Sequence, residues 1–246
     1  MCIRDRYRSE VAEIPSVGWL VMIISAIVHV GYSLALGAAY KTGDLSVVYP
    51  VSRSAPIFVL IIAVIFLGER VTAPGVLGIL IVVAGVMIMG WKGVKKDQLP
   101  DFRSLITSRS YLLAILVALI VALYSIFDKI GVRYVDPFVF LYLMLIPRFV
   151  MFFPYVMKVK RDKVMLEIKE NPLLIVAVGI LRLLGYFLVL VAMRMSPVSY
   201  IISARQISIV GGVILGTLVL KESYGRIRLL ASILIFLGIY IMTIFG

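Results

Sequence analysis

Cysteine, histidine and acidic residues are scarce in this sequence, and each scarcity removes a class of function. The single cysteine, Cys2, excludes an internal disulfide, and the single histidine, His29, leaves no Cys/His cluster for a metal. Acidic residues number 13 against 25 lysines and arginines. In an apolar chain, loops beside anionic lipid explain such a basic excess better than nucleic acid does. We therefore expect no metal, no cofactor and no nucleic-acid partner.

Long apolar runs dominate what is present. Hydrophobic residues make up 62% of the 246 residues, and the mean hydropathy is +1.09. The runs are about twenty residues long, which is the length of a helix that crosses a bilayer. This pattern predicts an all-α fold, a polytopic membrane helix bundle in contact with the lipid bilayer. We expect eight spans, at about 17–40, 45–67, 73–91, 110–128, 137–157, 172–193, 197–220 and 226–245.

The sequence contains two copies of one pattern, at about 30–88 and 184–241. Three residue pairs share a separation of 153 residues: Ser46 and Ser199, Glu69 and Glu222, and Gly85 and Gly238. The first three spans match the last three, which is a shift of five helices, so the second copy is inverted in the membrane. Inverted repeats are typical of secondary transporters, whose substrate sites lie near the midplane between the repeats.

These motifs resemble the EamA family of the drug/metabolite transporter superfamily. The resemblance rests on Gly43-Asp44-Leu45-Ser46-Val47-Val48-Tyr49-Pro50 with Arg53 and Pro56, on Phe66-Leu67-Gly68-Glu69-Arg70, on Gly75-Val76-Leu77-Gly78 through Ala84-Gly85-Val86, and more weakly on Leu220-Lys221-Glu222 and Gly238. It implies ten helices in two inverted five-helix repeats, with a central substrate pocket. We expect residues 1–16 to be a polar leader unlike family sequence, 17–91 a partial first repeat of three helices, 92–109 a basic loop, and 110–246 the second repeat of five helices. On this view the chain is a fragment that lacks the family's first two helices.

Four arginines fall inside predicted spans: Arg53, Arg148, Arg182 and Arg205. A charge at this depth is costly unless it faces protein or water. The acidic residues all lie in loops or near predicted helix ends, and the deepest, Asp128, is about one turn from an end. The arginines therefore have no evident carboxylate partner. Some of them are candidates to bind an anionic group of a substrate through the guanidinium fork. Pairing with backbone carbonyls is the alternative.

The candidate substrate-binding residues combine these arginines with polar residues at similar depth: Arg53, Arg182, Arg205, His29, Tyr32, Tyr49, Tyr186 and Gln206. His29 has two interpretations, since it can carry a proton or simply bond a neighbouring helix. No residue is assigned a catalytic role. For Glu69 and Glu222, at helix ends, we expect structural roles at the membrane interface rather than proton coupling.

The sequence thus favours a secondary transporter of small metabolites, with amino-acid-like or other small, anionic solutes as the substrate class and export as the expected direction. We expect a multi-pass protein of the inner (plasma) membrane. A carrier that flips a lipid head group and a membrane scaffold without transport activity stay open as alternatives, as does a homodimer. A membrane-embedded enzyme is less favoured, because the sequence has no HExxH motif, nucleophile motif or carboxylate pair within a span.

Overall fold

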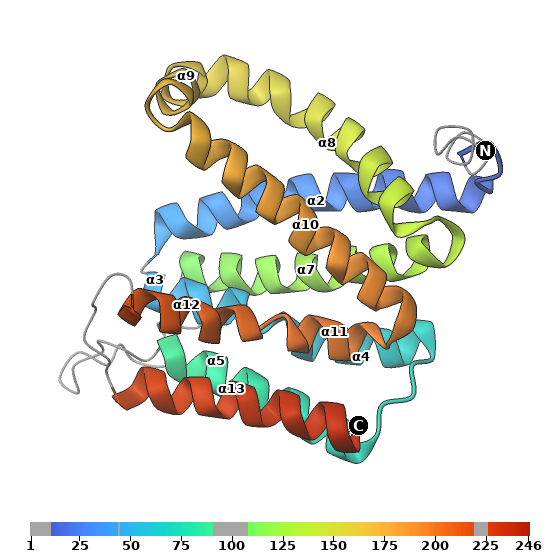
Figure 1. The fold of residues 1–246 in the computed structure, drawn as a ribbon, viewed down its shortest axis with the longest axis vertical. Helices are drawn as coiled ribbons and strands as arrows, with labels where there is room; N and C mark the ends of the chain where they lie inside the picture. Colours follow the sequence, from blue (N-terminus) through green and yellow to red (C-terminus); the bar gives the residue numbers. More distant parts are fainter. Residues whose placement is uncertain (1–10, 44, 91–107, 219–225) are drawn as a thin grey trace. The chain divides into compact units, whose positions relative to one another are not determined.

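A computed structural model of the protein describes residues 11–43, 45–90, 108–218 and 226–246, and these residues are helical almost throughout (Figure 1). The helices longer than one turn are α2 (Ser16–Thr42), α3 (Leu45–Ser52), α4 (Ala55–Leu67), α5 (Ala73–Gly90), α7 (Arg109–Tyr134), α8 (Pro137–Val159), α9 (Arg161–Glu170), α10 (Pro172–Met195), α11 (Val198–Ala204), α12 (Ile207–Leu218) and α13 (Arg226–Phe245).

Seven helical stretches in the described ranges are long and apolar enough to cross a membrane, with α3–α4 and α11–α12 each counted as one stretch. The remaining apolar helix, α5, is slightly shorter. The prediction of an all-α, polytopic membrane bundle is therefore confirmed. Two details of the predicted spans were wrong: α7 continues to Tyr134 instead of ending at residue 128, and the spans predicted at 45–67 and 197–220 are each broken in the middle.

The chain forms two compact units. Unit 1 takes residues up to Val30 together with Phe127–Ser196, and so contains the first part of α2, the end of α7, and α8 to α10. Unit 2 takes Gly31–Ile126 and Pro197–Gly246, and contains the rest of α2, the first part of α7, α3 to α5 and α11 to α13.

Local sequence sets several helix ends. Asp136 caps α8, because its carboxylate accepts the Phe138 N–H at 2.9 Å and Pro137 occupies the first turn. Gly68 ends α4 at φ 64°, a left-handed conformation that glycine adopts without penalty. The Glu69 N–H then returns to the Ala63 carbonyl at 3.2 Å. The chain thus turns away from α4 within two residues.

The closest helix packing in unit 2 joins α5 to α13, which lie side by side and antiparallel (Figure 1). A β-carbon on Gly78 would lie 2.6 Å from the Gly238 oxygen, and one on Gly85 would lie 2.9 Å from the Ala231 oxygen. Gly78 and Ala231 are 153 residues apart, as are Gly85 and Gly238. Ala231 is therefore the copy of Gly78, and Gly238 is the copy of Gly85. The contact of Gly78 with Gly238 and the contact of Gly85 with Ala231 are thus equivalent, with the two copies exchanged. This reciprocal pattern is that of a local two-fold axis between α5 and α13.

The other matching stretches of unit 2, α3–α4 and α11–α12, also run in opposite directions where α4 meets α11. Glu69, just after α4, contacts Val198 and Ser199 at the start of α11, whereas Arg53, just before α4, contacts Gln206 after α11. The helices α5 and α13, and the stretches α3–α4 and α11–α12, thus have the opposed directions that an inverted repeat requires.

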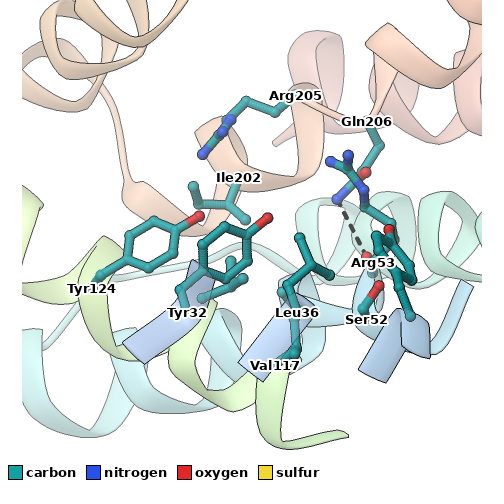
Figure 2. Close-up of a pocket in the computed structure, with 12 residues that line it drawn as sticks. Tyr32, Leu36, Ser52, Arg53, Val117, Tyr124, Ile202, Arg205 and Gln206 are labelled. Carbon is teal, nitrogen blue, oxygen red and sulfur yellow. Dashed lines mark hydrogen bonds between the residues drawn. The ribbon is translucent and has the colours of Figure 1, made fainter. Parts of the chain in front are cut away.

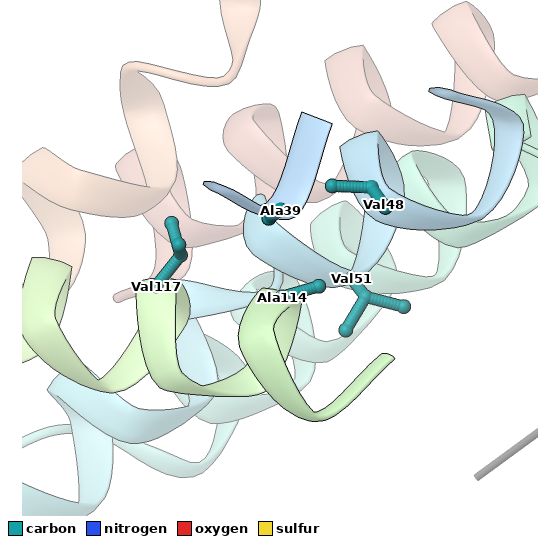
Figure 3. Close-up of a cluster of buried hydrophobic side chains, with 5 residues drawn as sticks. All are labelled: Ala39, Val48, Val51, Ala114 and Val117. Carbon is teal, nitrogen blue, oxygen red and sulfur yellow. The ribbon is translucent and has the colours of Figure 1, made fainter. Parts of the chain in front are cut away.

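A small apolar core joins three further helices of unit 2. Ala39 of α2, Val48 and Val51 of α3, and Ala114 and Val117 of α7 are buried together (Figure 3). Two of the five are alanines, so the helix backbones approach closely, as is common between membrane helices. This packing holds α3 beside α2 and α7. These three helices together supply more than half of the lining of a cavity in unit 2.

The glycine contacts predict that Gly78→Ala lowers stability. The new methyl group would overlap the Gly238 backbone, and we expect overpacking to cost about 1–3 kcal/mol. The measurement is the thermal unfolding of the purified protein in one detergent, followed by helical circular dichroism. Gly212→Ala is the matched control, because a β-carbon there meets no described atom within 4 Å. Equal midpoints for both variants would contradict the close packing of α5 and α13.

Candidate functional site

Two spanning helical stretches of unit 2 are interrupted, and both interruptions carry an arginine. Arg53 and Ser54 separate α3 from α4, while Arg205 and Gln206 separate α11 from α12. Arg53 and Gln206 are 153 residues apart, so the breaks fall at matching positions of the two copies. Broken helices at such matched positions are a common location of transporter binding sites.

Proline chemistry explains the first break. Pro56 has no N–H to bond the Ser52 carbonyl, and its ring disfavours a continuous helix through that turn. The Ile57 N–H bonds Ser54 O at 3.1 Å, which leaves the Arg53 carbonyl free of its helical partner. Gln206 Nε2 donates to that carbonyl at 3.3 Å. The side chain of one break therefore satisfies the backbone of the other.

The second break contains no proline and instead has a tightened turn. The N–H groups of Gln206, Ser208 and Ile209 each bond the carbonyl three residues earlier, at 3.1, 3.2 and 2.9 Å. Ser203 Oγ donates to Ser199 O at 2.8 Å, and Ser208 Oγ donates to Arg205 O at 2.9 Å. Serine hydroxyls thus donate hydrogen bonds to backbone carbonyls beside the break.

A cavity of about 50 Å³ lies beside the two breaks (Figure 2). Its polar lining comes from Tyr32 and Tyr40 of α2, Ser52 and Arg53, Tyr124 of α7, and Arg205 and Gln206. In Figure 2 the hydroxyl groups of Tyr32 and Tyr124 are directed toward the side of the cavity from which Arg205 projects. The cavity therefore combines two cationic groups with phenol hydroxyls.

Arg53 is held at the cavity by an aromatic ring. Its guanidinium carbon lies 5.3 Å from the ring centroid of Tyr49, which is within cation–π range. In the part of the chain that the structure describes, no carboxylate lies within ion-pair distance of this guanidinium. The Arg53 charge is therefore stabilised by the Tyr49 ring and by no described carboxylate.

Gln206 is deeply buried in the lining, with 4% of its surface exposed. Its amide nitrogen bonds Arg53 O, whereas its amide oxygen is buried and accepts no hydrogen bond from any described group. An unsatisfied buried acceptor is costly, so a donor from a bound molecule would be favoured beside it.

A second polar cluster lies in unit 1, around the fully buried carboxylate of Asp128. Ser25 and Tyr186 both donate their hydroxyl groups to this carboxylate, and His29 Nε2 lies 3.3 Å from Asp128 Oδ2. The Tyr186 hydroxyl is also 2.9 Å from His29 Nε2. The predicted candidates His29 and Tyr186 are thus brought together, in unit 1, around an acid that was not among the predicted site residues.

Lys129, the next residue of α7, has a structural role. Its Nζ donates to the carbonyls of Met193 and Ser196, with the second bond at 2.8 Å. A cation at these carbonyls is stabilised by the dipole at the C-terminus of α10. Lys129 therefore ties α7 to the end of α10.

Glu69 also has a structural role, in unit 2. Its carboxylate accepts the Val198 N–H at 2.7 Å, the Ser199 N–H at 3.3 Å and the Ser199 hydroxyl at 2.7 Å. These N–H groups begin α11 and have no partner within the helix, so the carboxylate caps that helix. Its predicted copy, Glu222, lies outside the described residues.

The predicted site residues divide between the two units. Arg53, Arg205, Gln206 and Tyr32 line the unit 2 cavity, with Tyr49 stacked on Arg53. His29 and Tyr186 belong to the unit 1 cluster. Arg182 is exposed on α10, a helix with little of its length buried. Within the described ranges no group of His, Cys, Asp or Glu side chains suits a metal ion.

The capping role predicts that Glu69→Ala destabilises the protein. The two α11 N–H groups would lose their acceptor, and each buried unsatisfied donor costs about 1–3 kcal/mol. Glu69→Gln keeps one carbonyl oxygen and should cost less. Thermal unfolding in detergent measures both, with Glu170→Ala on exposed α9 as the control. If Glu69→Ala unfolds at the temperature of the Glu170 variant, the capping interpretation is wrong.

Comparisons with known proteins agree with this architecture. The model of the EamA-like transporter family matches residues 5–91 and 108–244. A Sinorhizobium protein described as an uncharacterized transporter in the cobO 3′ region is 32% identical over 78 residues, which are 32% of this chain and 55% of that protein. An uncharacterized protein of Methanocaldococcus jannaschii is 34% identical over 67 residues, which are 27% of this chain and 49% of that protein.

The chain thus matches about half the length of these two relatives. A crystal structure with a TM-score of 0.70 and 18% sequence identity covers 97% of this chain and 82% of its own. At that identity the likeness concerns the fold alone.

Proposed function

This chain belongs to the EamA-like transporter family, and from that premise we propose that it carries small, anionic or zwitterionic metabolites across a membrane, with the unit 2 cavity as the substrate site. Family membership supports a membrane transporter in a lipid bilayer. The substrate class is inferred from the cavity itself, and the observation that carries it is the placement of Arg53 and Arg205 at the two helix breaks.

The cavity chemistry fits an amino-acid-like solute. The two guanidinium groups supply paired donors for a carboxylate. The unsatisfied Gln206 oxygen, with the hydroxyls of Tyr32 and Tyr124, offers acceptors for an ammonium group. A simple anion would use the arginines and leave the Gln206 oxygen without a donor. An amino-acid-like zwitterion uses both sets of groups.

The size of the cavity implies movement. At about 50 Å³ it holds a few water molecules, whereas sites for small organic ligands usually occupy roughly 300–1,000 Å³. Substrate entry therefore requires the lining helices to separate. Alternating access of two inverted repeats provides such a separation. Export through an inner (plasma) membrane is the direction and location that we propose.

The test is uptake of radiolabelled compounds into proteoliposomes that contain the purified chain. The panel comprises neutral and acidic amino acids, small carboxylates and a phosphate ester. We expect transport of at least one carboxylate-bearing compound. Arg53→Gln and Arg205→Gln should each weaken its apparent affinity about tenfold to a hundredfold, since a hydrogen bond to a charged group is worth about 1.5–3 kcal/mol.

Arg161→Gln, on exposed α9, removes the same charge away from the cavity and is the matched control. Equal transport by all three variants would remove the unit 2 cavity as the substrate site.

Arg182 supports a second candidate, a carrier for anionic lipid head groups. This guanidinium is exposed near the middle of α10, whose other charged residue, Arg194, lies in the last turn. A charge at mid-helix in lipid is costly unless an anion accompanies it. Scrambling of a fluorescent anionic lipid in the same vesicles measures this activity. Scrambling that Arg182→Gln abolishes, without transport of any soluble compound, would favour the lipid carrier.

A further inference from the structure

The cluster around Asp128 is a buried group of side chains that can bind a proton, and solute binding in the unit 2 cavity does not use it. Asp128 is fully buried, His29 is 4% exposed and Tyr186 is partly buried. We propose that this cluster is a proton-binding site and that a proton taken up by Asp128 or His29 drives substrate movement. The coupling step rests on the transport function proposed above, whereas the proton site itself does not.

The arrangement of donors supports proton binding. The Asp128 carboxylate accepts the Ser25 and Tyr186 hydroxyls, and His29 Nε2 lies 3.3 Å from Oδ2. A buried carboxylate that is surrounded by three potential hydrogen-bond donors is stable as an anion. When it is protonated, it loses one position that accepts a hydrogen bond. A neutral carboxylic acid carries its own O–H, so one of the present donors must turn away or become an acceptor. Protonation therefore rearranges the bonds between helices.

The helices that meet at the cluster are α2, α7, α8 and α10, and their charged groups limit what can titrate there. Lys129 follows Asp128 on α7, but its Nζ is bound to two carbonyls at the end of α10. On α8, Met144 Sδ lies 3.5 Å from Ser25 Oγ, and Arg148 follows one turn later. On α10, Arg182 precedes Tyr186 by one turn and is exposed. Asp128 is thus the one carboxylate of the described residues in this cluster.

The composition of the site favours a proton over a metal cation. Hard cations such as Na⁺ and Mg²⁺ prefer a shell of oxygen ligands, whereas the imidazole of His29 and the thioether of Met144 border this carboxylate. The step is a simple proton transfer. The carboxylate gains a proton from water to become a carboxylic acid, or His29 gains it to become an imidazolium paired with the carboxylate, and the proton leaves by the reverse step.

Two helices connect this chemistry to the substrate cavity through the chain itself. His29 precedes the cavity residue Tyr32 by three positions on α2, and Asp128 follows the cavity residue Tyr124 by four positions on α7. Protonation that breaks a hydrogen bond of Asp128 to α2 or α10 therefore changes the restraints on α2 and α7, which also carry cavity residues. This continuity provides a physical route from proton binding to substrate release.

The first experiment measures the proton directly and needs no substrate. Infrared difference spectra of the purified protein are recorded between acidic and alkaline buffer. We expect a pH-dependent band of Asp128, either the carbonyl band of the protonated acid or, where His29 takes the proton, a shifted carboxylate band. Asp128→Asn removes this band, and Asp162→Asn, on exposed α9, retains it. Tyr186→Phe, which deletes only a hydroxyl, should shift this band, so it serves if Asp128→Asn does not fold. A spectrum unchanged in Asp128→Asn, or in Tyr186→Phe where that variant stands in, would overturn the proposal.

The second experiment uses a labelled compound that the transport panel identifies. With an imposed pH gradient, we expect the wild-type protein to concentrate that compound, and Asp128→Asn to lose at least tenfold of the accumulation while still exchanging labelled for unlabelled compound. Accumulation that persists in Asp128→Asn, or that follows a sodium gradient instead, would overturn coupling. If the wild-type protein transports nothing in the panel, the transport proposal fails, and the infrared result still decides the proton site.

Discussion

The structure depends on one constraint: a peptide group inside a membrane must find its hydrogen-bond partner within the protein. Two spanning stretches of this chain give up part of their helical bonding, at Arg53–Ser54 and Arg205–Gln206. Each does so only where side chains supply replacements, with Gln206 bonding the Arg53 carbonyl and serine hydroxyls bonding others. The same sites admit cationic side chains to the protein interior. The cavity therefore exists where the backbone can be interrupted without loss of hydrogen bonds.

Much of this arrangement could be predicted from the sequence, because its causes are local or periodic. Runs of apolar residues gave the spans, and the 153-residue separation pointed to opposed copies, which the antiparallel contacts of α5 with α13 match. Arg53 beside Pro56 indicated a polar position within a span. The break at Arg205 had no proline to signal it, although its alignment with the first break contained that information.

The remaining features depend on contacts between distant parts of the chain. Asp128 was placed near a helix end, because Asp128, Lys129 and Arg133 together resemble a loop. In the structure α7 continues past them, since Asp128 is bonded to residues about a hundred positions earlier and 58 positions later, and Lys129 reaches the end of α10. For Arg182, the position near the middle of a span could be predicted from the sequence. The exposure of its helix could not, because it depends on how the other helices pack.

The local two-fold axis of unit 2 relates residues that are no longer alike. One break presents Ser52 and Arg53, while the aligned positions of the other hold Arg205 and Gln206. If the copies were identical, a bound molecule would make the same contacts in either of two opposite orientations. Divergence of these four side chains makes the two ends of the cavity chemically different. The amino-acid-like substrate that we propose would therefore have a single favoured orientation in it. A duplicated scaffold thereby acquires a direction that neither copy has alone.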